Sequence, residues 1–289
     1  MQRNQLVFDA IGTHWQIVYT SSHSSEENST LFTQMQRRID SFDRVYSRFR
    51  ADSLITKISQ KKGIYDLPSD AGLLFTQYKK LYDLTNGVFT PLVGLLLADA
   101  GYDSSYSLQP KRLRKVPRWD KVLAYDAGKL IVKKPVLLDF GAGGKGYLID
   151  LIGNILKRKG IADFFINAGG DIVAHTKKPL RVGLENPKNT AEVIGVAKIS
   201  NESICGSAGN RRVWENFHHI MYPGLKKSVS HILATWVIAE NGLLADSLST
   251  CLFFSPPKIL LKEFHFSYAI VYEDLSLEVS KDFSAEFYS

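Results

Sequence analysis

The stretch LDFGAGGKGYLID, residues 138–150, places four glycines and one lysine between an apolar run and a helical pattern. Glycines at 141, 143 and 146 have the G-x-G-x-x-G spacing of dinucleotide-binding turns, in which main-chain amides hold a pyrophosphate. Lys145 adds the positive charge that such a group attracts. By itself the stretch is equally compatible with a tight turn whose glycines serve only left-handed backbone angles.

The residues on both sides of this stretch predict its structural context. A hairpin that turns at Asp126-Ala127-Gly128 precedes it, so we expect the glycine loop to follow a strand. Beyond the loop, apolar residues recur at helical spacing from Leu148 to Leu156, and Gly160 ends the pattern. We therefore expect a strand, a glycine turn and a helix in succession.

Two well-known nucleotide-binding folds agree poorly with the following residues. A Rossmann unit continues with a parallel strand that ends in an acidic residue, whereas the next apolar run ends in Asn167 and two further glycines. A Walker A loop requires glycine where the chain has Asp139 and a hydroxyl residue where it has Gly146, which excludes it.

The composition is that of an ordinary soluble globular protein of 289 residues, with 45% hydrophobic and 22% charged residues. No run reaches the roughly 20 apolar residues needed to span a bilayer. The first residues lack the apolar core of an export signal and a cysteine for a lipid, so we expect a cytoplasmic protein. Cys205 and Cys251 form no C-x-x-C pair and are expected to be buried thiols.

The formal net charge of +7 raises the question of nucleic-acid binding. The densest basic run, residues 111–121, is one short cluster beside a proline without surrounding aromatic strand motifs. Such a cluster is typical of a solvated loop, so we expect no nucleic-acid partner.

Strand and helix patterns alternate along the whole chain without a repeat or a linker. A strand pair is expected within residues 6–20, and helices within 31–49, 72–84 and 242–254. Five strand-like runs follow the glycine loop. We predict an α+β protein with mixed or antiparallel sheets and packed helices, forming a single interwoven domain over residues 1–289.

Asp246 and Thr250 are four residues apart in the predicted helix 242–254, so they lie on one face about one turn apart. A carboxylate and a hydroxyl form a hard oxygen site of the kind that Mg²⁺ prefers, and the ion completes its shell with water and phosphates. The alternative is a carboxylate at a helix start and a threonine bonded to a carbonyl of its own helix.

The chain resembles the ApbE family of FAD:protein FMN transferases. The resemblance rests on short motifs in a fixed order: IGT at 11–13, SRFRADSLITKIS at 47–59, TNGVFTPLVGLL at 85–96, the glycine stretch, INAGGDI at 166–172, VGLENP at 182–187, HHIMYP at 218–223 and ADSLSTCLF at 245–253. It implies a T-fold-like domain that moves FMN from FAD to a threonine hydroxyl of an acceptor flavoprotein, releases AMP and uses Mg²⁺.

The resemblance also implies roles for single residues. The metal would be held by the carbonyl of Ala142 and the side chains of Asp246 and Thr250, in agreement with the oxygen site described above. FAD would lie along a further set of residues: Ile11, Phe49, Val88, Phe89, Thr90, Asp139, Lys145 and Ile220. His219 would lie near the flavin and pyrophosphate, and we predict it as the general base because imidazole titrates near neutrality. A histidine bonded within a strand turn is the alternative.

The chain departs from the family pattern at several positions. The usual aspartate is Thr90, the usual Thr-Ser-Gly is Gly206-Ser207-Ala208, another aspartate is Tyr222, a Thr-Gly pair is Leu225-Lys226, and a methionine is Ile11. These departures keep two other interpretations open. One is a Mg²⁺-dependent FAD pyrophosphatase that releases FMN and AMP, and the other is a flavin-binding protein without catalysis.

Overall fold

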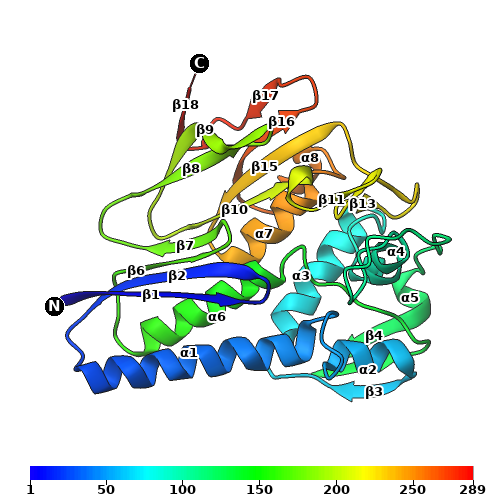
Figure 1. Cartoon of the computed structure of the whole chain (residues 1–289), viewed down its shortest axis with the longest axis horizontal. Helices are drawn as coiled ribbons and strands as arrows, with labels where there is room; N and C mark the ends of the chain where they lie inside the picture. Colours follow the sequence, from blue (N-terminus) through cyan, green and yellow to red (C-terminus); the bar gives the residue numbers. More distant parts are fainter. Residues whose placement is uncertain (289) are drawn as a thin grey trace.

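An eight-stranded antiparallel sheet runs through the middle of the protein in the computed structural model, which describes residues 1–288 (Figure 1). The spatial order of its strands is β1-β2-β6-β7-β10-β15-β16-β17. Every pairing in this sheet is antiparallel, which rules out a Rossmann unit and confirms the predicted α+β class. The strands are β1 Gln2–Ala10, β2 Thr13–Ser21, β6 Phe164–Ala168, β7 Asp171–His175, β10 Ser203–Ala208, β15 Ile232–Ala239, β16 Ser267–Tyr272 and β17 Leu277–Val279.

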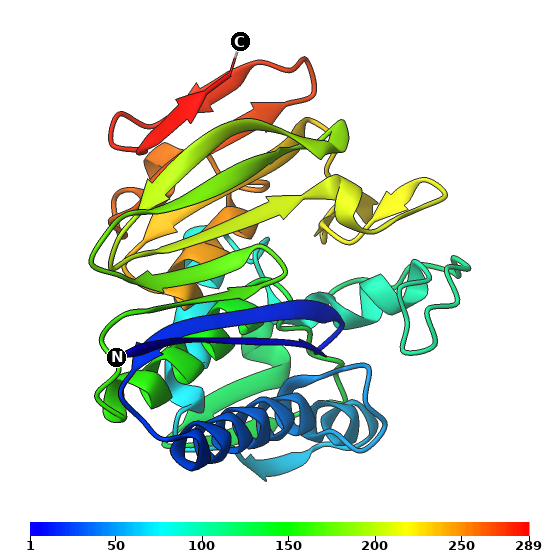
Figure 2. The same cartoon turned by 60° about the vertical axis from the view of Figure 1, so that its left-hand side comes forward.

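Helices cover one face of this sheet. The helices α6 (Gly144–Arg158) and α7 (Gly242–Cys251) lie directly on the strands and cross each other, while α1 (Ser25–Tyr46) packs on the outside of α6 (Figures 1 and 2). The helix α3 (Ala71–Leu84) contacts α7. Apolar side chains from these helices and from the sheet form the largest buried cluster of the protein. The two helices that carry the predicted site are therefore embedded in the main core.

A smaller sheet covers part of the opposite face. Its order is β18-β9-β8, built from Ala285–Phe287, Asn189–Ile199 and Leu180–Asn186. A second apolar cluster, which includes Ile204 and Trp236, fills the space between the two sheets. The part of the large sheet under the small sheet is thus buried on both faces, which accounts for the nearly continuous apolar run of β15.

Short elements complete the structure at the side of the helical layer. One group consists of α2 Leu54–Gln60, β3 Gly63–Asp66, α5 Trp119–Val122, β4 Leu123–Asp126 and β5 Lys129–Val132. The short helix α8 Pro257–Leu260 follows α7 in the chain and lies apart from this group (Figure 1). The other consists of the 3₁₀ turns η1 Pro91–Val93 and η2 Gly209–Arg211, the helix α4 Gly94–Asp99, and the strands β11 Val213–Trp214, β12 Phe217–His218, β13 Met221–Tyr222 and β14 Lys227–Ser228. A third apolar cluster joins α4 to β11 and β13.

Most expected elements are present, but the strand expected before the glycine loop is wrong. Residues 133–140 form no strand, although Leu138 and Phe140 are buried. The amide of Asp139 donates instead to the carbonyl of Pro91 at 2.7 Å, and the segment packs against α4. Its apolar residues fill the helical core rather than a sheet. The hairpin β4–β5 and the helix after the loop are confirmed.

Two further expectations concern membranes and cysteines. Among residues 1–288, no helix has the length and apolarity required to cross a membrane. Cys205 and Cys251 are both free, buried thiols, as expected.

Candidate functional site

The glycine loop leads into α6 at the point where α6 crosses α7. A Cβ atom added to Gly146 would lie 2.0 Å from the carbonyl oxygen of Gly242, and one added to Gly242 would lie 2.4 Å from the carbonyl oxygen of Gly146. Both positions therefore require glycine because the two backbones touch. Gly146 is thus required for the close packing of the two helices, not for a left-handed backbone conformation.

Hydrogen bonds join the two helices in both directions at this crossing. The amide of Gly146 donates to Oδ2 of Asp246 at 2.8 Å. In return, Asp150 accepts from the amides of Gly242 and Leu243 at 2.7 and 2.8 Å, at the start of α7. The position of the Asp246 carboxylate is thus fixed by main-chain groups of α6.

The buried groups at Asp246 carry more negative than positive charge. Burial, and next the neighbouring Asp171 carboxylate, raise the pKa of Asp246 to about 7, against the opposing effects of Lys145 and the Gly146 amide. Lys145 forms an ion pair with Asp171. Burial alone would lower the pKa of Lys145, but Asp171 and Asp246 together raise it above its usual value. Two buried carboxylates thus face one ammonium group, an arrangement that a bound cation would stabilise.

Thr250 lies one turn beyond Asp246 on α7, and its hydroxyl is held from outside the helix. Its Oγ1 is 3.0 Å from Oγ of Ser207 on β10, which is also 2.8 Å from Oγ of Ser249. The alternative interpretation of this pair is wrong on both counts. Asp246 is in the middle of α7 rather than at its start, and the hydrogen bond of Thr250 goes to another element.

Tyr78 on α3 adds an unexpected group beside the glycine loop. Its ring lies against Gly143, and its fully buried hydroxyl has no hydrogen-bond partner among residues 1–288. Burial, followed by the carboxylates of Asp139 and Asp246, raises its pKa well above the usual value. The hydroxyl is thus buried near two carboxylates and the Ala142 main chain, without a hydrogen bond of good geometry.

Asp139 is held by a buried arginine that no sequence pattern had singled out. The guanidinium of Arg48 pairs with Asp139 and donates to the carbonyl of Tyr102 at 2.7 Å. It also lies 4.1 Å from the ring centroid of Phe49. Phe49 is half-buried and stacks on Tyr106 with 5.1 Å between ring centroids. The stacked rings of Phe49 and Tyr106 form an aromatic platform that Arg48 connects to the predicted FAD contact Asp139.

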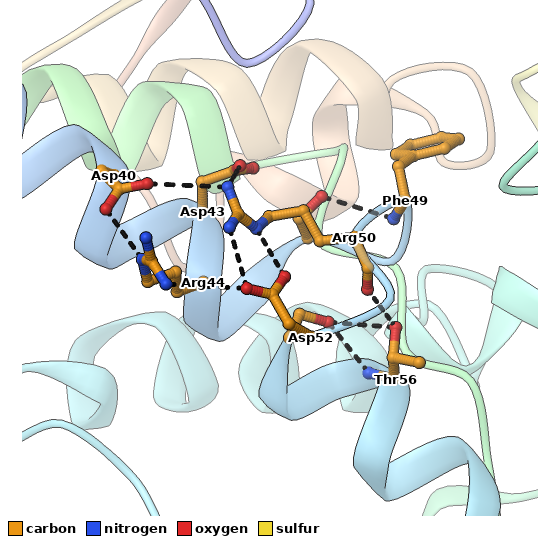
Figure 3. A network of polar contacts seen from close by, with 9 residues as sticks. Asp40, Asp43, Arg44, Phe49, Arg50, Asp52 and Thr56 are labelled. Atoms are coloured by element: carbon orange, nitrogen blue, oxygen red, sulfur yellow. Dashed lines mark hydrogen bonds and ion pairs between the residues drawn. The ribbon is translucent and has the colours of Figure 1, made fainter.

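The loop that carries Phe49 is fixed on its other side by a network of arginines and aspartates (Figure 3). Arg50 pairs with Asp43 of α1 at 3.1 Å and with Asp52 at 2.9 Å. The carbonyl of Arg50 accepts from the hydroxyl of Thr56 at 2.6 Å, at the start of α2. In Figure 3 the Phe49 ring points away from these ion pairs. The network sets the direction in which the ring is presented.

The two adjacent histidines have different environments. Nε2 of His218 is 2.7 Å from the carbonyl of Val229, and its Nδ1 accepts from the amide of Ile220, so it is the histidine bonded within a strand turn. His219 has a buried Nδ1 with no partner in the part of the chain that the structure describes. Burial, followed by Arg212, lowers the pKa of His219 to about 3, so the ring is neutral at pH 7.

The remaining predicted FAD residues are distributed over two other segments. Ile11 occupies the β1–β2 turn with φ of 51°, a left-handed conformation that is unfavourable for a β-branched residue. Phe89 is buried against Tyr78, with 5.1 Å between ring centroids. Thr90 is also buried, and its hydroxyl accepts from the amide of Leu92. Val88 and Ile220 are half-buried and buried, respectively.

The structure thus brings most of the predicted metal residues and part of the predicted FAD set to one crossing of helices. Within residues 1–288 there is no group of three or more histidine, cysteine, aspartate or glutamate side chains that could hold a metal. The predicted metal ligands are one carboxylate, one hydroxyl and one main-chain carbonyl. They therefore do not form a cluster of such side chains. Four further residues contact the predicted site residues: Asp171, Arg48, Tyr78 and Ser207. Each of them is distant in sequence from the residue that it contacts.

The fold is shared with proteins of known structure. The structure aligns with the ApbE protein of Thermotoga maritima with a TM-score of 0.81 at 24% identity, covering 97% of each chain. It aligns with the flavin transferase ApbE from Vibrio cholerae with a TM-score of 0.77 at 17% identity, covering 99% of this chain and 96% of that one. The chain therefore has the fold of the ApbE flavin transferases.

Sequence comparison gives the family. The ApbE family model matches residues 11–265, and the chain belongs to the ApbE family. A FAD:protein FMN transferase of Rhodobacter capsulatus is 27% identical over 200 residues, which are 63% of this chain but 38% of that protein's length. The FAD:protein FMN transferase of Vibrio cholerae is 21% identical over 259 residues, covering 83% of this chain and 78% of that protein.

Proposed function

We propose that this protein is a Mg²⁺-dependent FAD:protein FMN transferase. The observation that carries the proposal is the position of the buried Asp246 carboxylate, which is fixed by the Gly146 amide beside an unpartnered Tyr78 hydroxyl and the Lys145 ammonium. Membership of the ApbE family and the names of the relatives support it.

The residues present fit a magnesium ion. The carbonyl of Ala142, the carboxylate of Asp246 and the hydroxyl of Thr250 would hold it, and all three ligands are oxygen atoms. When bound there, Mg²⁺ would neutralise charge on the pyrophosphate of FAD. Ser207 fixes the hydroxyl of Thr250, and the Gly146 amide fixes Asp246, so the chain holds two of these ligands without help from the ion.

The reaction joins the acceptor hydroxyl to the FMN phosphorus and breaks the bond from that phosphorus to the bridging oxygen. The hydroxyl proton is lost, and AMP leaves with the bridging oxygen. Lys145, half-buried in the first turn of α6, stabilises the added charge on the phosphate oxygens. Asp139 and Phe49 bind and orient the flavin half, supported by Arg48.

His219 has a free ring nitrogen and lies close enough to Asp139 and Lys145 for their charges to act on it. We assign to it a hydrogen bond to the attacking hydroxyl as general base. A pKa of about 3 leaves the ring neutral at pH 7, so its free nitrogen can accept this hydrogen bond, although the near-neutral titration expected of imidazole is absent. Replacement by glutamine, which retains a hydrogen-bonding group, is expected to lower turnover by about tenfold.

The test combines purified protein, FAD and Mg²⁺ with an acceptor polypeptide that contains a threonine, and follows AMP release and the acceptor's intact mass. An acceptor mass gain of one FMN, abolished by EDTA, is the expected result. AMP release without acceptor modification would identify a pyrophosphatase instead. Bound FAD without any AMP would identify a flavin-binding protein.

Asp246→Asn isolates the metal site in the same assay. The amide side chain still accepts from Gly146 but lacks the charge, so transfer should fall by about 100- to 1000-fold while the protein stays folded. Asp274→Asn, which removes an exposed carboxylate, is the matched control. Equal rates for both variants would refute the metal assignment.

A further inference from the structure

Two segments of the chain, residues 99–118 and 211–228, project from the same side of the protein, beyond the sheet and the helices (Figure 2). Contacts join them to each other. Nε1 of Trp214 donates to the carbonyl of Ala100 at 2.6 Å, and Nζ of Lys226 donates to the carbonyl of Leu113 at 3.0 Å. The two segments therefore form one unit, which we call the basic arm.

The basic arm carries most of the net charge of the protein. Its two segments contain nine lysine and arginine residues and three acidic residues, a net charge of +6 in a chain whose formal net charge is +7. Three of the nine cations form ion pairs, with Asp99, Asp120 and Glu185. The other six have no ion pair within residues 1–288: Lys111, Arg112, Lys115, Arg212, Lys226 and Lys227. Unpaired like charges repel one another, and an acidic surface would relieve this repulsion.

Large apolar side chains are exposed among these cations. Tyr106 and Leu108 belong to the first segment of the basic arm, and Val213 and Leu225 to the second, and all four are exposed to solvent. Protein–protein interfaces combine apolar contacts with surrounding polar and charged groups. The basic arm therefore offers both kinds of group to a partner protein.

The basic arm is continuous with the candidate site. The ring of Tyr106 stacks on Phe49 with 5.1 Å between centroids, and the guanidinium of Arg48 lies 4.5 Å from the ring centroid of Tyr102. The second segment of the arm includes His219, the proposed general base. A polypeptide that brings its hydroxyl to His219 therefore lies beside the arm.

Resting on the proposed function, we propose that the basic arm is the docking surface for the acceptor protein, and that this acceptor carries an acidic patch beside the hydroxyl that it presents. Attraction between the two charged surfaces would accelerate their encounter and select acidic partners. An anionic membrane or a nucleic acid would also be attracted to the arm, but neither supplies the protein hydroxyl that the proposed reaction consumes.

The test compares two fusion acceptors that share one threonine-containing segment, chosen from a random peptide pool because the wild type labels it with FMN. One fusion has a tail of glutamates, and the other has a serine tail of the same length. At low ionic strength, the kcat/KM for FMN transfer should be about tenfold higher for the glutamate fusion, through a lower KM. The difference should vanish at about 1 M salt, where the Debye length is about 3 Å.

Two double variants show where the preference originates. Arg112→Glu/Lys115→Glu reverses two unpaired charges of the basic arm and should lose the preference for the glutamate fusion. Lys177→Glu/Lys178→Glu reverses two exposed lysines in the β7–β8 loop and should retain it, although the change in net charge is the same. The Kd for FAD should be unchanged in both variants, because none of these side chains belongs to the predicted FAD set.

Equal kcat/KM values of the wild type for the two fusions would overturn the docking proposal and leave the proposed function intact. The same loss of preference in both double variants would also overturn it, because the arm would then contribute no more than the overall charge. Binding of the wild type to phosphatidylglycerol vesicles, lost in Arg112→Glu/Lys115→Glu, together with equal labelling of the two fusions, would assign the arm to a membrane surface instead. If the wild type labels no peptide in the pool, the proposed function fails, and the acceptor role of the arm fails with it.

Discussion

The crossing of α6 and α7 and the aromatic platform at Phe49 are built in opposite ways. At the crossing, backbone meets backbone through Gly146 and Gly242, and main-chain amides hold the carboxylates. At the platform, a side chain holds the carboxylate instead: Arg48 pairs with Asp139 and lies against the ring of Phe49. The proposed metal and phosphate end is thus fixed by helices, whereas the proposed flavin end depends on a loop and its ion pairs.

This difference predicts that substitutions at the helix crossing destabilise the protein more than substitutions at the aromatic platform. Gly146→Ala would place a Cβ 2.0 Å from a carbonyl oxygen that cannot move without shifting α7. We expect a loss of more than about 4 kcal/mol in unfolding free energy and about 10 °C in Tm, measured by thermal denaturation. Gly153→Ala on the same helix, where the added atom meets Phe164 at 3.4 Å, should change Tm by only about 2 °C. Similar Tm values for both variants would refute the packing argument.

The second largest effect on stability is expected for the ion pair between Arg48 and Asp139, beside the aromatic platform. Arg48→Met leaves the Asp139 carboxylate without its buried partner, which should cost about 3 kcal/mol in unfolding free energy. Arg50→Met, two residues away in the more exposed network of Figure 3, should cost less than about 1 kcal/mol. Urea denaturation of both variants checks this. An equal cost would show that burial does not distinguish these arginines.

The platform itself should affect binding more than folding. Phe49→Leu removes the ring that stacks on Tyr106, and we expect the Kd for FAD to rise about fivefold with little change in Tm. Flavin fluorescence measures the Kd. Phe32→Leu, which removes a half-buried ring that packs on Phe8, is the control and should leave the Kd unchanged. A normal Kd for Phe49→Leu would remove the ring from the FAD site.

The smallest effect concerns pH and the hydrogen bonds from α7 to Asp150. Burial raises the pKa of Asp150 from 3.8 to about 6, so the folded state binds more protons than the unfolded state between these values. The stability contribution of this group therefore falls as pH rises from about 4 to about 6. Asp150→Asn should remove this part of the Tm dependence, about 3 °C. The exposed substitution Asp126→Asn should leave the wild-type pH profile of Tm intact, whereas a wild-type profile in Asp150→Asn would contradict the assignment.

Local patterns were sufficient for many elements of the fold. Apolar spacing identified α6 and α7, and the hairpin turn at 126–128 gave β4 and β5. The patterns missed β7 and β10 as strands, because these strands are short and β10 contains small and polar residues. They also gave a strand at Leu138, since burial in a helical core and burial in a sheet select the same apolar residues.

By itself the sequence determined the residue types and spacings of the site: a glycine loop with one lysine, and a carboxylate and a hydroxyl one helical turn apart. Only the tertiary structure decided that Gly146 donates to Asp246, that Lys145 pairs with Asp171 and that Arg48 holds Asp139. These partners are 100, 26 and 91 residues apart. Periodicity reports which face of an element is buried, but not which distant element covers it, because that choice depends on the packing of the whole chain.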